Sequence, residues 1–348
     1  MRSAGEPVIG AVVAALLAGP AALHAQAPAA ARSEIVTYQN PVDGLPLSAQ
    51  LFLPPGEGPF SGVVLLTLAG AGELIERLTD LGWAVLMSER RGIATIEHLL
   101  RASFDDLAID VRAGADYLRR RPEVDATRVG LIAQGGETMA ALLAAVEPPL
   151  PAFVVLLSTT GLPGDQSFRI EQRQIALYRN YDTEALAALD DFVVQLTEMV
   201  IAEPSLGLRA SRMRPMLEGS DVRLPRSASF PPNPEDQVRF FASRWWRDLF
   251  LFRPDLALAK LAVPTLVVMG DQDPITPYQE HLPAIAQRLA EAPTQDATAC
   301  LVTGLVRHSI TPPILAVLER WLGDRLTADG FVSHPGARPG GCIEAPLR

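Results

Sequence analysis

The chain contains little cysteine and no excess of positive charge. Two of its 348 residues are cysteine, too few and too scattered for a zinc site built from thiolates. Lysine and arginine together number 30 against 40 aspartates and glutamates, which gives a net charge of −10. Because binding to a phosphate backbone needs a basic stripe, we expect no nucleic-acid partner.

Metal motifs, like-charge runs and long apolar runs are also missing from the body of the chain. The five histidines show no H-E-x-x-H spacing, so we expect no metal and no other cofactor. The absence of like-charge runs argues against a disordered interaction tail between the two ends. Beyond the N-terminal segment, no apolar run is long enough to cross a bilayer.

The N-terminal segment has the order of a secretory signal peptide. Arg2 precedes the apolar stretch Val8–Leu17, and small residues follow around Ala25 and Ala27. A membrane anchor is the alternative, but Pro20 and the shortness of the apolar run leave too little length to span a bilayer. We therefore expect cleavage of residues 1–27. The mature protein should be periplasmic or secreted, without stable membrane insertion.

The two cysteines stand far apart in different kinds of segment. Cys300 lies in an apolar run that predicts a late strand, and Cys342 lies in a tail rich in proline and glycine. Export makes a disulfide permissible, and a bond between the two would fasten the tail to the body. Two unrelated thiols are the alternative, which the sequence leaves open.

Short apolar runs predict a sheet. Ile35–Tyr38 and Leu47–Leu53 alternate in polarity and flank Asp43-Gly44, a pattern typical of an antiparallel hairpin. Later runs are apolar on both faces, as in a parallel sheet covered by helices. These runs are Val63–Leu66, Trp83–Met87, Val129–Ile132, Phe153–Leu157 and Thr265–Met269.

Helical patterns fill the gaps between these strands. Phe104–Arg120 is amphipathic, Thr138–Val146 is apolar all round and should be buried, and Tyr278–Glu291 and Pro312–Leu322 follow later. The alternation of strands and helices predicts the α/β class. We expect a mostly parallel, doubly wound sheet with the antiparallel hairpin at its N-terminal end.

Residues 164–256 break this alternation. They contain helical pieces such as Glu184–Ile201 and no comparable strand run. We expect a helical cap insertion over the strand ends, where ligands bind in open α/β sheets. The predicted boundaries are 28–163 and 257–323 for the two parts of the core, 164–256 for the cap and 324–348 for a C-terminal tail.

The segment Val129–Thr138 resembles the nucleophile elbow of α/β-hydrolases, in which a G-x-S-x-G turn between a strand and a buried helix lifts a serine above the sheet. Its central residues read Ala133-Gln134-Gly135-Gly136-Glu137. Gly135 stands at the serine position, so the resemblance implies a degenerate site without a nucleophile. A tight turn would itself favour glycine for its positive φ, and this is the purely structural interpretation.

Two later segments resemble the rest of that family's site. Met269–Pro274 closes a strand, and its Asp273 falls on the family's acid; Gly304–His308 precedes the last helix, and His308 falls on the family's histidine. The resemblance implies that Asp273 orients His308 as a general base. The alternative is that Asp273 caps a loop and that His308 lies on the surface.

The resemblance covers most of residues 34–322 and is to secreted bacterial ester hydrolases. That branch also resembles the hydrolase domains of prolyl-oligopeptidase-type serine peptidases. It implies that the backbone N–H groups of Gly70 and Gly136 form an oxyanion hole. The further segments that carry it are Ser88–Gly92, Arg121–Asp125, Phe153–Gly164 and Trp245–Arg247.

Two functions are expected from these residues. The leading one is a degenerate hydrolase that binds a small apolar or acylated ligand; the alternative is a weak ester hydrolase in which His308 activates water directly. A purely structural or interaction module has little support. Ser158, Thr159 and Ser309 are nearby hydroxyls, none of which is favoured as a nucleophile. His24 falls in the signal peptide, and the remaining histidines, His98, His281 and His334, are expected on the surface.

Overall fold

A computed structural model describes residues 32–67, 71–89, 91, 96–220, 222, 233–304, 310–327, 330–335 and 342–344. The predicted signal peptide lies outside these residues. By their internal contacts the described residues form two units. Among the described residues, the helical unit comprises residues 96–103 and 162–253, and the sheet unit comprises residues 32–91, 104–161 and 254–344.

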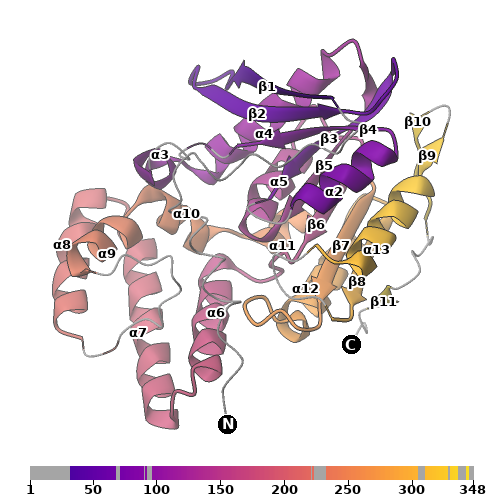
Figure 1. Cartoon of the computed structure of the whole chain (residues 1–348). Helices are drawn as coiled ribbons and strands as arrows, with labels where there is room; N and C mark the ends of the chain where they lie inside the picture. Colours follow the sequence, from indigo (N-terminus) through magenta and orange to yellow (C-terminus); the bar gives the residue numbers. More distant parts are fainter. Residues whose placement is uncertain are drawn as a thin grey trace, which may run out of the picture. The chain divides into compact units, whose positions relative to one another are not determined.

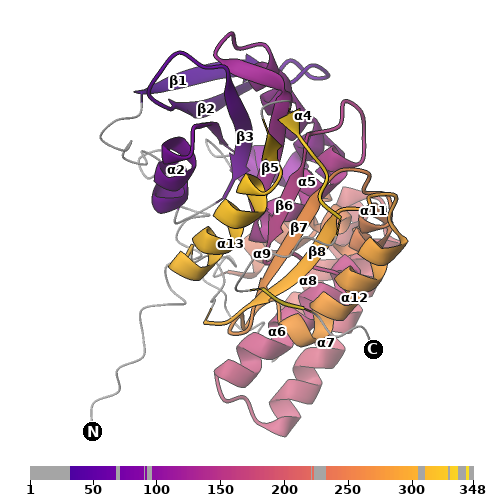
Figure 2. The same ribbon diagram turned by 90° about the vertical axis from the view of Figure 1, so that its right-hand side faces the viewer.

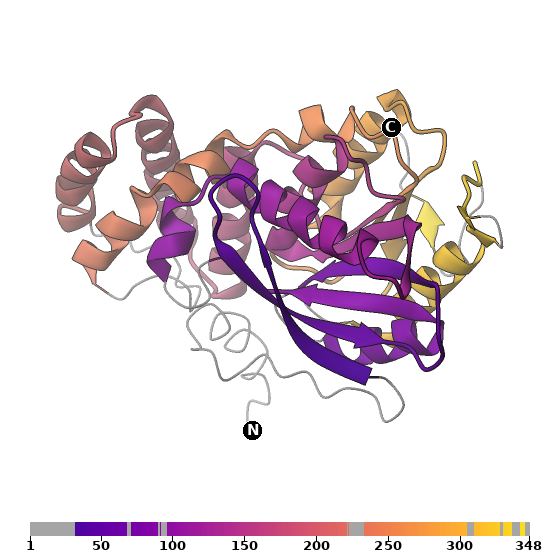
Figure 3. The ribbon, with the colours of Figure 1, turned by 90° about the horizontal axis from the view of Figure 1, so that it is seen from above.

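The sheet unit contains a nine-stranded sheet in the order β1-β2-β4-β3-β5-β6-β7-β8-β11, in which β11 is the short strand Ile343–Glu344. Figure 3 shows the antiparallel pair β1–β2 in indigo, and this pair is the predicted hairpin. From β4 to β8 all neighbouring strands are parallel, which confirms the predicted sheet. The strands are β1 (Arg32–Gln39), β2 (Pro46–Leu53), β3 (Phe60–Leu66), β4 (Trp83–Ser88), β5 (Val124–Gln134), β6 (Val154–Leu157), β7 (Thr265–Gly270) and β8 (Ala297–Val302).

Helices cover both faces of this sheet (Figures 1 and 2). One face carries α2 (Ala71–Asp80) and α13 (Pro312–Gly323). The other carries α4 (Phe104–Arg119), α5 (Thr138–Ala145), α11 (Pro254–Leu258) and α12 (Tyr278–Glu291). Seven of the eight residues of α5 are buried, as its uniformly apolar sequence predicts.

The core of the sheet unit contains a cluster of aromatic side chains that pack around Phe153. Its ring lies 4.5 Å from that of Phe331 and 5.5 Å from that of Trp83, centroid to centroid. Gly130 on β5 faces this ring so closely that an added Cβ would come within 2.2 Å of it. Packing therefore requires glycine at position 130.

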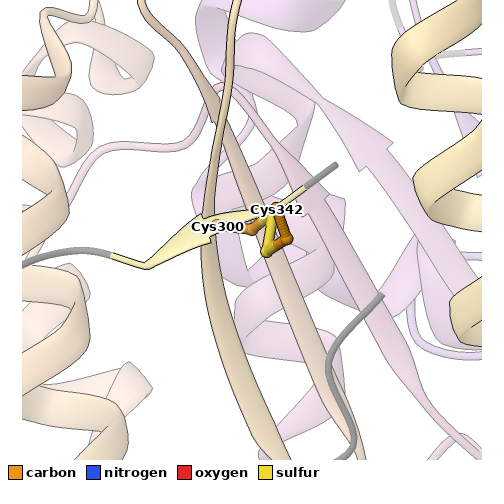
Figure 4. Close-up of a disulfide and its surroundings, with 2 residues drawn as sticks. All are labelled: Cys300 and Cys342. Atoms are coloured by element: carbon orange, nitrogen blue, oxygen red, sulfur yellow. A yellow bond between two sulfur atoms is a disulfide. The ribbon is translucent and has the colours of Figure 1, made fainter. Parts of the chain in front are cut away.

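The C-terminal tail contains three short strands that the sequence did not predict: β9 (Leu326–Thr327), β10 (Gly330–Phe331) and β11 (Ile343–Glu344). The tail is fastened by the fully buried Arg325, whose Nε donates to the Asp296 carboxylate at 2.8 Å. The same carboxylate accepts the backbone N–H of His334 at 2.8 Å. β11 pairs antiparallel with β8, where a disulfide joins Cys300 to Cys342 (Figure 4).

The helical unit contains no strand among its described residues. Its helices are α3 (Ile96–Arg101), α6 (Gly164–Tyr178), α7 (Thr183–Ala202), α8 (Leu206–Glu218), α9 (Pro234–Phe241) and α10 (Arg244–Leu251). Its own core is aromatic, with the Phe168 ring 5.2 Å from that of Trp246. Asp182 and Ser243 cap two of the helices by accepting backbone N–H groups. The placement of this unit as a cap over the strand ends stays a prediction.

Candidate active site

Strand β5 ends at Gln134 and passes into α5 through the 3₁₀ turn Gly135–Glu137. Gly135 has a φ of 61°, in the left-handed region that residues with a Cβ enter at a cost. Its carbonyl oxygen accepts the backbone N–H of Thr138 and, at 2.6 Å, the Thr138 hydroxyl. The strand, turn and helix predicted at this point are all present, and the turn is held from the helix side.

The two glycines of this turn have different explanations. The positive φ of Gly135 accounts for glycine there, whereas no positive φ is found at Gly136. Nothing lies within 4 Å of the point where a Cβ on Gly136 would stand, so packing does not require glycine at that position. The purely structural interpretation therefore explains Gly135 and leaves Gly136 unexplained.

Asp273 lies in the turn after β7 and is buried. Its Oδ1 accepts the backbone N–H groups of Ile275 at 2.9 Å and Thr276 at 3.0 Å. Its Oδ2 is buried without a hydrogen-bond partner among the described residues. Leaving a buried acceptor unsatisfied costs about 1–3 kcal/mol, and more when the group is charged. One oxygen is thus fixed by the backbone while the other is open to a donor, the arrangement of a carboxylate that orients an imidazole.

His308 lies outside the described residues. The segment that leads to it begins at Gly304, which contacts the turn after β7 that contains Asp273, called the acid turn below. The backbone N–H of Gly304 donates to Asp271 Oδ1 at 2.6 Å, and the N–H of Asp271 donates to the carbonyl of Val302 at 3.3 Å. The segment that contains His308 therefore begins in contact with a residue two positions before Asp273. Asp271 was not singled out in the sequence, where it is one more polar residue of a turn.

The turn after β6 lies between the elbow and the acid turn. Leu157 pairs with Gln134 of β5 on one side and with Val268 of β7 on the other. Ser158 follows with a φ of 51°, and its N–H donates to the carbonyl of Val268 at 2.8 Å. The next hydroxyl, that of Thr159, donates to the Thr138 hydroxyl at 2.9 Å. Through Thr138 this turn is connected to the carbonyl of the elbow glycine.

The surface position predicted for His281 is wrong. The side chain is 1% exposed, its Nδ1 accepts the Gly161 N–H at 3.3 Å, and the same atom lies 3.3 Å from Thr160 Oγ1. The signal was present in the sequence, because residues 281, 285 and 289 repeat every four positions along one face of α12. Ile285 and Leu289 on that face are buried. The other two histidines predicted on the surface, His98 and His334, are exposed.

Part of the predicted oxyanion hole lies outside the described residues, because Gly70 is not among them. The strand before that loop is nevertheless connected to the elbow: the hydroxyl of Thr67, directly after β3, donates to Gln134 Oε1 at 2.8 Å. Gln134 is buried. The ends of β3, β5 and β6 are thus joined by side-chain hydrogen bonds around position 135.

Neither a metal-ligand cluster nor a membrane-spanning helix is found among the described residues. In the part of the chain that the structure describes, no three histidine, cysteine, aspartate or glutamate side chains come together as metal ligands would. None of the described helices is both long enough and apolar enough to cross a membrane.

No family model matches the chain, and no curated protein matches it. Solved structures do. A Pyrococcus furiosus esterase has 13% identity and a TM-score of 0.53, over 84% of this chain and 90% of the other. A complex of DcsB with its substrate analogue has 13% identity and a TM-score of 0.56, over 84% and 99%. A puromycin-hydrolyzing peptidase of Mycobacterium tuberculosis has 13% identity and a TM-score of 0.58, over 90% of this chain and 42% of that longer one.

At these identities the likeness concerns the fold. The mostly parallel sheet, the helices on both its faces and the strand–turn–helix at position 135 agree with it. The chain therefore has the α/β-hydrolase fold.

Proposed function

We propose that this chain is an exported protein that binds a small acylated ligand at the carboxyl edge of its sheet and forms no acyl-enzyme there. The signal-peptide pattern of residues 1–27 supports a periplasmic or secreted location. The disulfide between Cys300 and Cys342 supports it as well, because such bonds persist in oxidising compartments.

The observation that carries the proposal is Gly135 itself. It occupies the first position after β5, at the start of the turn into the buried helix α5, and has the positive φ of a sharp turn. A nucleophile at this point would need a side-chain oxygen, and glycine has none. Without it the usual two-step acyl transfer is closed, because no covalent intermediate can form at this position.

The surroundings support retention of a ligand site. The turns after β5, β6 and β3 are joined by hydrogen bonds through Thr138, Thr159 and Gln134. Such a connected edge keeps backbone N–H groups in place for a carbonyl oxygen. An esterase and a peptidase are among the proteins of the same fold. A carboxylic-ester or amide carbonyl is therefore the ligand group to test first.

Asp273 favours a second candidate function, weak ester hydrolysis by water. A buried carboxylate anchored through Oδ1 and open at Oδ2 is suited to hold the imidazole of His308 as a general base. In serine proteases that have lost a triad residue, the remaining site still gives roughly 10³–10⁴-fold catalysis over water. The space left at Gly135 would then hold the attacking water.

Three probes test both candidates on the mature protein. A fluorophosphonate reports a reactive hydroxyl, 4-nitrophenyl butyrate reports ester turnover, and the ketone isostere of that ester reports binding without turnover. We expect no covalent labelling and a higher melting temperature with the ketone, about 2.7 kcal/mol of stabilisation at a hundredfold excess over Kd. Stoichiometric labelling of Ser158, Ser309 or another hydroxyl would contradict the absence of a covalent route. If neither ketone binding nor ester turnover is seen, the ligand class is wrong.

The second candidate requires that ester turnover depend on His308. His308→Ala should abolish turnover, and His98→Ala, a change at an exposed histidine, should leave it unchanged. Turnover that persists without His308 would exclude water activation by that residue.

A further inference from the structure

The turn after β6 has a conformation that its own residues do not favour. Ser158 has a φ of 51°, one of only two positive values at non-glycine positions in the described chain. Serine lacks the local preference that asparagine, at the other such position, has for this region. A strained residue of this kind persists only where neighbouring contacts hold it, so the contacts made by the residues next to Ser158 matter for its geometry.

One contact holds the turn toward the elbow and the other toward α12. On the elbow side, Thr159 donates to Thr138, whose hydroxyl donates to the carbonyl of Gly135. On the other side, Nδ1 of His281 accepts the Gly161 N–H at 3.3 Å and lies 3.3 Å from the Thr160 hydroxyl. The three residues that directly follow the strained serine are therefore held by hydrogen bonds to two different elements.

The hydrogen bonds define the state of the imidazole. Because Gly161 N–H can only donate, Nδ1 must be an acceptor, which assigns the neutral tautomer with its proton on Nε2. The fit is close at the backbone as well: an added Cβ on Gly161 would stand 2.6 Å from the carbonyl oxygen of His281. The turn thus packs directly against the first turn of α12.

His281 occupies a helix face that apolar residues could fill. Its neighbours on that face, Ile285 and Leu289, are buried, and a leucine at position 281 would avoid the cost of burying an imidazole. The feature that histidine adds is a fixed acceptor at Nδ1. α12 begins five residues after Asp273. The acceptor on His281 therefore joins this helix to the turn Ser158–Gly161, which is itself connected to position 135.

We propose that His281 is a positioning residue of the candidate site: its neutral Nδ1 holds the turn Ser158–Gly161 and, through Thr159 and Thr138, the orientation of position 135. The inference rests on the proposed function in that it assigns the same sheet edge to ligand binding. It adds a residue that neither touches the ligand nor belongs to the acid–histidine pair.

Three substitutions separate the acceptor from the packing. His281→Leu fills the space without an acceptor, His281→Asn places an amide oxygen close to the position of Nδ1, and His281→Gln places it farther out, near the position of Nε2. His98→Leu, at an exposed histidine, is the matched control. One readout is amide hydrogen exchange at Gly161, measured against the central strands. The other is turnover of 4-nitrophenyl butyrate in a Gly135→Ser background.

We expect His281→Leu to exchange the Gly161 amide at least tenfold faster. It should also lower kcat by at least tenfold, which removes the gain made by Gly135→Ser, at an unchanged KM, since small displacements of a reacting group are costly. His281→Asn should restore both readouts, and His281→Gln should not. An unchanged Gly161 exchange rate in His281→Leu overturns the proposal, as does a folded His281→Asn that behaves like the leucine variant.

The design keeps the two proposals apart. If Gly135→Ser shows no turnover, the proposed arrangement around position 135 fails, and the exchange rate alone still decides the role of His281. If His281→Leu does not fold, the comparison of the asparagine and glutamine variants decides it, because both are polar and differ in where the acceptor stands. Equal exchange rates in those two variants overturn the proposal.

Discussion

Asp271 and Gly304 are joined by a hydrogen bond of 2.6 Å between the Asp271 carboxylate and the Gly304 backbone N–H. Asp271 stands two residues before Asp273, and Gly304 four residues before His308. The bond therefore joins the turn after β8, which begins the segment leading to His308, to the turn after β7, which contains Asp273. The two turns are far apart in the sequence but close in space, because β7 and β8 are parallel neighbours and end at the same edge of the sheet.

The open oxygen of Asp273 leads to the first prediction. In Asp273→Asn, one amide oxygen can still accept the N–H groups of Ile275 and Thr276, so the turn should stay folded with a nearly unchanged melting temperature. The other position becomes an NH₂ donor, which cannot accept from an imidazole N–H. In a Gly135→Ser background, ester turnover should fall back to the level of the Gly135 parent, because the same change at the triad aspartate of a serine protease removes most of the rate.

Asp273→Ala is the control for this prediction. It removes both backbone contacts as well as the charge, so it should lower the free energy of unfolding by about 1–3 kcal/mol in addition to its effect on turnover. An Asp273→Asn protein with undiminished turnover would show that Asp273 orients nothing.

The second prediction concerns the tail. Mass spectrometry without reductant should find the Cys300–Cys342 link, which closes a loop with a sequence separation of 42. In the chain-entropy model such a loop contributes about 3–4 kcal/mol to the free energy of unfolding. Reductant should therefore lower the denaturant midpoint of the wild type, while a Cys300→Ser, Cys342→Ser double variant should be insensitive to it. Two free thiols in protein isolated from the periplasm would contradict the prediction.

The third prediction is a loss of stability at high pH. Burial, opposed by the hydrogen bond to Ser88 and reinforced by the charges of Asp110 and Glu89, raises the pKa of Tyr38 to about 12. The folded state then holds the proton more tightly than the unfolded state, whose tyrosine pKa is about 10. The Tyr38 proton therefore contributes roughly 2–3 kcal/mol to the free energy of unfolding. This contribution is fully present below pH 10 and is lost as the pH rises toward 12.

Urea unfolding between pH 8 and 12 measures this loss. Tyr38→Phe removes both the titration and the 2.8 Å contact with Ser88, so it should be less stable than the wild type at pH 8 and should lose less on the way to pH 12. Tyr178→Phe, at a tyrosine that is 58% exposed, should follow the wild type throughout. Parallel curves for Tyr38→Phe and the wild type would contradict the predicted titration.

Patterns that repeat along one element could be predicted from the sequence. Each central strand is a continuous apolar run because it is buried on both faces, and the helices between them keep their apolar stripes. The hairpin around Gly44 could be located because a tight turn limits the residues it accepts, and the turn at Gly135 could be located by its resemblance to the strand–turn–helix of α/β-hydrolases. These signals are local, and they place the strand ends where the candidate site lies.

Contacts between distant segments could not be predicted in the same way. The tail strands are two residues long, too short for a periodic pattern, and the buried ion pair in the tail joins Arg325 to Asp296, 29 positions away. His281 belongs to the buried face of its helix, but its polarity concealed this. The support it gives to Gly161, 120 positions away, appears only when β6 and α12 are brought together. The positive φ of Ser158 likewise has no sequence signal of its own.

The fourth prediction separates lost chemistry from lost architecture through Gly135→Ser. The φ of 61° at this position costs a serine about 1–2 kcal/mol, so the variant should melt a few degrees lower and its folding must be checked first. The added hydroxyl should then meet a base that Asp273 orients. Fluorophosphonate labelling should appear at residue 135, and turnover of a short-chain ester should rise at least tenfold above the parent. Family-level rates are not expected, because Ala133 and Glu137 also depart from the elbow pattern and small misplacements of the oxyanion donors are costly.

Gly136→Ser is the matched control, because it places a hydroxyl one residue along in open space without a backbone penalty. It should gain neither label nor turnover, since only position 135 stands at the start of the turn where the family's serine would be. Adding His308→Ala to Gly135→Ser should remove the gain, because the serine then has no base to take its proton. A folded Gly135→Ser protein without any gain would mean that the histidine segment does not reach the elbow, although Gly304 and Asp271 hold its start beside the acid turn. A gain that survives the loss of His308 would instead show that another group takes the proton and that His308 is not the base.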